Sequence, residues 1–397
     1  MQNANKQIVV ACLLLGVFYF FVQIVFLNFY AVYKLPFGRG DVDNYFEILS
    51  PTVTKNIMVH PGLYMGILFL SKFTNIALVF TLLIPFMACL VLNLVFFIFM
   101  LYFTKDPNTS LFALVLFIFG TYSMEAFIIS AFWAQLFATI LLLLFIIFFE
   151  HYKANNNKTS LILAIISSII MLPIHVKVAG CIFLYIMIRA FFDKEYVKSI
   201  ILFLIVLIGV LVYPNVLNSD YVIDVTLTQV LSDFMLPIFW VIIVFYFFKR
   251  WAVFNNTEKT WATFFILTFI ISSKAALWRP LLSVLPLGIY FVSKFFNWLY
   301  YNKIVFVSAV ILVLIWSASY SRYQTSLALT SMVGEMVPGV FNDTTRNMDP
   351  EPLLKMFSAS NDDLNKFNAY NKTHRVTGFV SSLTGQVTEK DEVIYGS

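Results

Sequence analysis

Long runs of apolar residues, separated by short polar breaks, dominate this sequence. A helix needs about 20 apolar residues to cross the hydrocarbon core of a bilayer. A chain inside lipid must also satisfy its own backbone polar groups, which a helix does within one segment. The runs are continuous rather than alternating, which excludes an outer-membrane barrel. Charged residues make up only 12% of the chain, against about 25% in soluble domains. The sequence therefore predicts an all-α polytopic membrane protein.

The positions of the polar breaks predict about eleven transmembrane helices, within a range of ten to twelve. Turns at 122–126 and 175–177 divide apolar runs that are too long for a single crossing. The predicted spans lie near 8–32, 76–103, 110–124, 128–150, 160–175, 178–192, 198–214, 234–248, 260–275, 280–298 and 304–319. Residues 1–319 then form one transmembrane module, and residues 320–397 form a tail or small domain.

The distribution of basic residues predicts the orientation of these spans in a plasma or inner membrane. Short cytoplasmic loops carry an excess of Lys and Arg. With a cytoplasmic N-terminus, twelve basic residues fall on the inner side and seven on the outer side, leaving out the tail. The inner set is Lys6, Lys105, Lys153, Lys158, Arg189, Lys194, Lys198, Lys249, Arg250, Lys259, Lys294 and Lys303. The first outer loop (33–75), an acidic loop (215–233) and the C-terminal tail are then extracytoplasmic.

The first outer loop carries two carboxylates, Asp41 and Asp43, directly after the first predicted span. Charged groups that cluster beside a membrane need a physical reason to be there. One reading is an ordinary solvated loop in which an Asp caps the helix that starts near Asn44. The other reading is a catalytic acid at the membrane surface. A second apolar stretch from His60 onward is interrupted by polar residues and predicts an interfacial helix lying along the membrane.

This arrangement resembles the first outer loop of the GT-C superfamily of glycosyltransferases, which use polyprenyl-phosphate sugars as donors. In that superfamily an Asp, often followed four residues later by a Tyr, lies just after the first transmembrane helix. Asp41 and Tyr45 match this spacing. The resemblance implies a GT-C-like fold, with Asp41 and Asp43 as catalytic candidates and Tyr45 in substrate binding.

A second resemblance lies late in the chain, where Arg279 precedes Pro280 at the predicted outer start of a helix. Many GT-C enzymes place an Arg there to bind the donor phosphate. A guanidinium group suits phosphate because its donors match the phosphate oxygens. Lys274 adds a second positive charge five residues earlier. The alternative role for Arg279 is an interfacial anchor whose charged end reaches the membrane surface.

The resemblance implies an inverting transfer of a sugar to a glycan, glycolipid or protein acceptor on the outer face. An acceptor hydroxyl needs a base within about 3 Å, and Asp41 supplies one. A cationic group or a divalent metal must stabilise charge on the departing phosphate. The acceptor motif of oligosaccharyltransferases is absent from the sequence, which leaves the monosaccharide-transferring branches, including O-antigen-modifying glucosyltransferases. Apart from that metal, no cofactor is implied.

Four further residues at predicted outer turns are candidates for substrate contact. Glu125 and His60 are candidates for substrate binding, and His175 with Lys177 for contact with the donor phosphate. The alternatives are structural: Glu125 as a solvated loop residue, His60 as a residue at a helix start, and His175 with Lys177 as interfacial anchors. Four scattered histidines predict no metal site, and no glycine-rich nucleotide loop occurs. Basic residues are scattered over many loops, which indicates no nucleic-acid partner.

Two other classes of membrane protein fit a polytopic chain. A transporter or flippase of lipid-linked saccharides places ionisable residues at the membrane midplane and often has paired broken helices. Here nearly every charge maps to the end of a span. An O-antigen polymerase or ligase typically has basic residues in a large late outer loop, whereas the loop at 215–233 is acidic. Both remain alternatives to the glycosyltransferase, as does a non-catalytic scaffold.

Overall fold

A computed structural model describes residues 84–121, 133–212, 235, 237–272 and 278–299, together with residues 62, 63, 65, 66, 69 and 73. Regular structure in these residues is helical, apart from one antiparallel bridge between Thr121 and Met235. The elements are α5 (Ile84–Thr104), α6 (Pro107–Gly120), α8 (Trp133–Asn155), α9 (Lys158–Ile174), α10 (Val176–Phe192), α11 (Tyr196–Val212), α13 (Pro237–Arg250), η4 (Trp251–Val253), α14 (Asn256–Ser272) and α15 (Trp278–Leu299).

Each predicted span between 76 and 298 corresponds to one of these α-helices, with ends that differ by a few residues, except that residues 76–83 of the span predicted at 76–103 lie outside the described residues. Three segments are long and apolar enough to cross a membrane: Met87–Thr104, Trp133–Asn155 and Pro280–Leu299. The segments Pro107–Ile118 and Lys158–Ile174 are apolar but shorter. The helical membrane-protein class is thus supported in the described part of the chain. The spans predicted at 8–32 and 304–319 lie outside the described residues, so the count of eleven stays a prediction.

Short polar segments begin the helices through side-chain caps. The Asp106 carboxylate accepts hydrogen bonds from the backbone N–H groups of Asn108 and Thr109, and Pro107 occupies the first turn of α6. The Asn157 side chain accepts from Thr159 N–H at the start of α9. These caps satisfy N–H groups that have no partner inside the helix. The polar breaks therefore fix where α6 and α9 begin.

Three of the helices end in the same way. Lys105, Asn156 and Lys194 follow α5, α8 and α10, and each has a positive φ, between 51° and 65°. A left-handed residue at this position lets its own N–H bond back to a carbonyl of the last turn. Lys105 N–H bonds to the Leu101 carbonyl at 3.1 Å, for example. The chain can then reverse within one or two residues.

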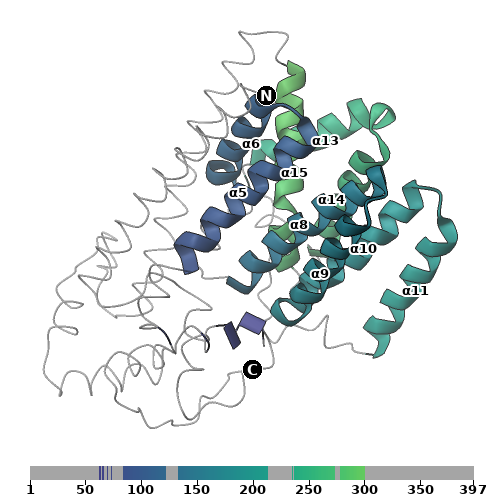
Figure 1. The fold of residues 1–397 in the computed structure, drawn as a ribbon. Helices are drawn as coiled ribbons and strands as arrows, with labels where there is room; N and C mark the ends of the chain where they lie inside the picture. Colours follow the sequence, from purple (N-terminus) through teal and green to yellow (C-terminus); the bar gives the residue numbers. More distant parts are fainter. Residues whose placement is uncertain are drawn as a thin grey trace, which may run out of the picture. The chain divides into compact units, whose positions relative to one another are not determined.

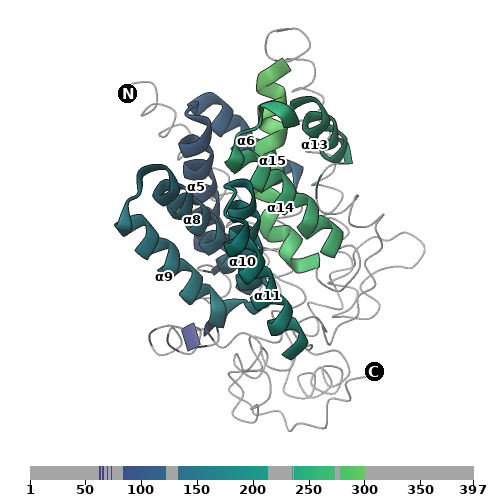
Figure 2. The same cartoon turned by 90° about the vertical axis from the view of Figure 1, so that its right-hand side faces the viewer.

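The described helices belong mostly to one compact unit, residues 91–124 and 134–321. Within it, α15 packs against α6, α13 and α14, and α10 packs against α9, α11 and α14 (Figures 1 and 2). Residues 280–292 of α15 are all buried. Gly288 makes close packing possible, since a Cβ atom there would meet the Phe265 ring at 2.9 Å. Helix α15 therefore lies in the core of this unit.

Helices α9 and α11 present apolar side chains outward. On α9 the exposed set is Ile162, Leu163, Ile165, Ile166, Ile169, Ile170 and Leu172. A surface of this kind would be unstable in water, but it suits contact with lipid tails. Its presence supports the membrane environment that the sequence predicts.

A second unit, residues 15–90, 125–133 and 322–397, is described at few positions. Residues 62, 63, 65, 66 and 69 are helical. Met65, Phe69 and Phe73 are exposed, and the rings of the two phenylalanines lie 5.1 Å apart. Met65 and Phe69 are four residues apart, a spacing that places them on one helical face, and Phe73 lies in a turn. An exposed apolar stripe is typical of the interfacial helix predicted from His60 onward.

Candidate functional site

The described residues contain three of the positions that the sequence analysis singled out. They are His175, Lys177 and Arg279. Asp41, Asp43, Tyr45, His60, Glu125 and Lys274 lie outside the described residues. Their predicted roles therefore stay predictions.

A break was predicted at 175–177, and the chain does break between α9 and α10. His175 is the one residue between these two helices, and it is 3% exposed. Lys177 is the second residue of α10. Its Nδ1 accepts a hydrogen bond from Val178 N–H at 3.3 Å and so caps α10. His175 thus starts a helix, and the role predicted for it and Lys177 in phosphate binding stays a prediction.

Arg279 is the second residue of α15, and Pro280 occupies the next position. Proline is tolerated in the first turn of a helix because its missing N–H has no partner there. The sequence Trp278-Arg279-Pro280 therefore begins this helix, as the sequence analysis expected. Further along α15, Tyr290 donates to Glu258 near the start of α14. The start and the later part of α15 thus lie at different ends of the helical unit.

About one turn after the start of α15, three buried polar residues are joined in a ring of hydrogen bonds. Gln135 Nε2 donates to Ser283 Oγ, and Thr139 Oγ1 lies 2.9 Å from the same oxygen. Thr139 Oγ1 donates to the Gln135 backbone carbonyl at 2.7 Å. Because the Thr139 proton is used there, Ser283 donates to Thr139. We call Gln135, Thr139 and Ser283 the amide–hydroxyl ring.

The amide–hydroxyl ring links α8 to α15. Its members are between 0% and 1% exposed. They are not among the residues predicted from the sequence. The available signal was their spacing: Gln135 and Thr139 are four residues apart, as are Arg279 and Ser283. Residues four apart share a helical face, so polar residues at this spacing inside apolar spans indicate a polar contact within the bundle.

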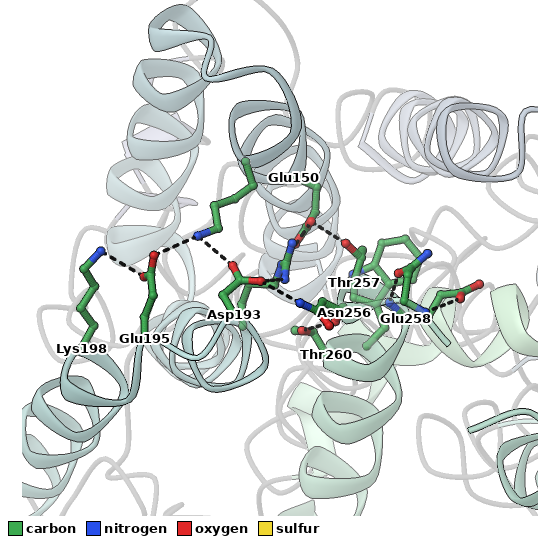
Figure 3. Close-up of polar contacts among 12 residues, drawn as sticks. Glu150, Asp193, Glu195, Lys198, Asn256, Thr257, Glu258 and Thr260 are labelled. Atoms are coloured by element: carbon green, nitrogen blue, oxygen red, sulfur yellow. Dashed lines mark hydrogen bonds and ion pairs between the residues drawn. The ribbon is translucent and has the colours of Figure 1, made fainter. Parts of the chain in front are cut away.

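At the other end of the unit, a network of charged residues joins α8, α10 and α14 (Figure 3). Glu150 lies at its centre. Arg189 Nε donates to Glu150 Oε1 at 3.0 Å, and Tyr185 Oη donates to the same oxygen at 2.7 Å. Thr257 Oγ1 donates to Glu150 Oε2 at 2.8 Å. Both oxygens of the buried carboxylate are therefore occupied.

The network continues into the connection between α10 and α11. Asp193 pairs with Arg189 and with Lys153 Nζ, which lies 2.8 Å from Asp193 Oδ2. Glu195 accepts from Lys198 at 3.0 Å and lies 3.7 Å from Lys153 (Figure 3). We call the set Glu150, Lys153, Arg189, Asp193 and Glu195 the charged end.

The surroundings of Asp193 and Glu195 favour the ionised form of these two carboxyl groups. For Asp193, burial alone would raise the pKa, but the Lys153 hydrogen bond and the charges of Arg189 and Lys153 outweigh it and lower the pKa. For Glu195, the hydrogen bond from Lys198 lowers the pKa. A carboxylate held ionised by its neighbours is a stable partner in ion pairs. This arrangement holds the helices together.

No group of three or more His, Cys, Asp or Glu side chains in the described residues is placed to hold a metal ion. Compared with family models, with curated proteins and with solved structures, the chain matches none of them. The candidate functional residues of this chain are therefore the predicted ones, Asp41 among them, and those at the start of α15 and in the amide–hydroxyl ring.

Proposed function

We propose that this protein is an inverting glycosyltransferase that takes a sugar from a polyprenyl-phosphate donor. Its acceptor is a glycan, glycolipid or protein on the outer face of the membrane. The observation that carries the proposal is the pair of sequence motifs that resemble the GT-C pattern, Asp41 with Tyr45 and Arg279 with Pro280. The helical bundle supports it, because Arg279 falls at the first turn of α15, away from the charged end.

The proposed reaction is one in-line displacement at the anomeric carbon of the donor sugar. Asp41 takes the proton of the acceptor hydroxyl as its oxygen bonds to that carbon. The bond from the carbon to the phosphate oxygen breaks, and the polyprenyl phosphate leaves with the electron pair. Arg279 and Lys274 stabilise the charge on the departing phosphate. One displacement inverts the anomeric centre, which makes the product stereochemistry a direct readout of this mechanism.

The experiment that tests the proposal replaces the acids of the first outer loop. Asp41→Asn keeps the size of the side chain and much of its hydrogen bonding but cannot accept a proton. Loss of a general base costs on the order of 10²–10⁴ in rate, so glycan transfer in cells should fall below detection while protein accumulation stays normal. Asp43→Asn should reduce transfer less, because Asp43 orients the substrate.

The control is Asp106→Asn, which changes a helix cap in the connection between α5 and α6. An Asn caps helices as well as an Asp does, so transfer should stay at the wild-type level. Full transfer by the double variant D41N/D43N at normal expression would remove the main support for a glycosyltransferase.

A further inference from the structure

The amide–hydroxyl ring leaves one strong hydrogen-bonding atom unused. Gln135 Nε2 is engaged by Ser283, but Gln135 Oε1 has no hydrogen-bond partner among the described residues. The whole residue is 1% exposed. A buried acceptor without a donor destabilises the fold because it has lost its hydration, and buried polar groups in proteins are normally paired. An unpaired amide oxygen held in place by its own nitrogen is thus an acceptor ready for a ligand.

The position of the ring relates it to the start of α15. Ser283 lies one turn after position 279, on the same helical face. The Cα–Cβ bonds of a helix tilt toward its N-terminus, so the Ser283 side chain leans toward the turn that contains position 279. From Trp278 to Ser283 the helix rises about 7.5 Å, at 1.5 Å per residue. Because Ser283 Oγ accepts from the Gln135 amide, that amide is held about one helical turn from the first turn of α15.

Gln135 Oε1 is a hydrogen-bond acceptor, so the part of the ligand that binds it must carry a hydrogen-bond donor. A polyprenyl-phosphate sugar has three parts. The prenyl chain has no hydrogen-bond donor, and the ionised phosphate diester has only acceptors. The hydroxyl groups of the sugar are donors. Of these three parts, only the sugar can donate a hydrogen bond to the unpaired amide oxygen.

We propose that Gln135 binds a hydroxyl of the donor sugar through Oε1, and that Thr139 and Ser283 position its amide for this contact. The inference rests on the proposed function and adds a sugar-binding residue to it. In this arrangement Arg279 binds the phosphate, and Gln135 fixes the orientation of the sugar that the phosphate carries. The contact is the same in the ground state and the transition state, so its loss raises KM and leaves kcat nearly unchanged.

The test uses the full-length protein in membranes, with a polyprenyl-phosphate hexose that the wild type transfers. A net hydrogen bond is worth about 0.5–1.5 kcal/mol, so Gln135→Leu should raise KM for this donor about three- to tenfold. Sugar-free polyprenyl phosphate is the second probe, as a competitive inhibitor. Its Ki should stay the same in Gln135→Leu, because it has no sugar to contact residue 135. Arg279→Ala should raise both constants.

Ser293→Ala is the matched control. It removes another buried hydroxyl of α15, one that donates to the Tyr290 carbonyl of the same helix at 2.8 Å and lies outside the amide–hydroxyl ring, so both constants should stay within about twofold of the wild type. A general loss of packing around α15 would make Gln135→Leu and Ser293→Ala behave alike. If Gln135→Leu does not accumulate, Gln135→Met, with an unbranched side chain of similar length, takes its place.

Three results would overturn the inference. The first is an unchanged donor KM in Gln135→Leu, and the second is an equal rise in KM and in the Ki of the sugar-free lipid. Either would leave the proposed function intact, because the wild type and Arg279→Ala report on that function separately. The third is a wild type that transfers no hexose from any polyprenyl phosphate, which would overturn the proposed function together with the inference.

Discussion

Asp193 lies in the connection between α10 and α11, where two basic side chains surround its carboxylate. Lys153 lies 2.8 Å away, and Arg189 contacts the other oxygen. The ion pairs outweigh the burial of the group and lower its pKa. This single residue therefore couples three segments that are distant in sequence: the end of α8, the end of α10 and, through Asn256, the start of α14.

The lowered pKa of Asp193 predicts a stability that depends on pH. The unfolded chain has an Asp pKa of about 3.9, so the stabilisation by this group is complete above that pH. It is lost as the pH falls through the lower folded value. We expect Asp193→Asn to lower the melting temperature of the protein in detergent at pH 7, and we expect the difference from the wild type to shrink below pH 4.

Melting temperatures at a series of pH values between 7 and 3 measure this difference. Glu195→Gln is the control, because Glu195 is more exposed than Asp193 and should show a smaller change of the same sign. A difference for Asp193→Asn that stays constant over this range would show that the ion pairs do not stabilise the fold.

At the scale of helices, Glu150 and Arg189 join α8 to α10, and Thr257 extends the joint to α14. A buried ion pair contributes less than its geometry suggests, since both groups lose their hydration. Removal of one partner is much more costly than removal of both, because it leaves an unpaired buried charge. The joint is therefore best tested by single and double replacement.

We expect Arg189→Met to destabilise the protein by about 3–5 kcal/mol, the cost of a buried carboxylate without its cation. The double variant Glu150→Gln with Arg189→Met should recover most of this loss, since the amide oxygen at position 150 can accept from Tyr185 while the amide nitrogen donates to the Thr257 hydroxyl. Denaturation in detergent measures the order of stability. Lys198→Met is the control: its side chain is 70% exposed, so its loss should cost less than about 1 kcal/mol. A double variant less stable than Arg189→Met would contradict this account.

The helices were predictable from the sequence because a chain inside lipid must satisfy its own backbone hydrogen bonds. An apolar run of sufficient length must form a helix there, and residues such as Asp106 and Asn157 mark where the next helix starts. The contacts between helices were not predictable in this way. Gln135 and Ser283 are 148 residues apart, and Glu150 and Arg189 are 39 apart. No local pattern pairs them, so only the fold shows that each pair meets.

For the candidate site, the sequence alone could suggest functional residues only by their resemblance to a family pattern. That pattern includes loop residues and one helix start, Arg279. The buried acceptor of Gln135 has no counterpart in it. Its role depends on which atoms of the amide are already occupied, and this is a property of the packed helices.

At the scale of the whole molecule, the two ends of the described helical unit differ in charge. Five acidic and basic residues gather at the charged end. The connections after Lys153, Arg189 and Arg250 lie on that side by the contacts they make. Short loops rich in Lys and Arg stay in the cytoplasm. We therefore expect the charged end to face the cytoplasm and the start of α15 to face outward, which is also what an outward-facing glycosyltransferase requires.

Cysteine labelling of intact cells tests this orientation. In a background without Cys12, Cys89 and Cys181, single cysteines replace Ser50, Lys194 and Ser360. Ser50→Cys and Ser360→Cys belong to the predicted outer loop and tail and should react with a membrane-impermeant maleimide. Lys194→Cys is exposed at the charged end and should react only after the membrane is opened. The opposite pattern would place the charged end outside. It would put Asp41 and Arg279 on the cytoplasmic side, where an outer-face sugar transfer by these residues is physically impossible.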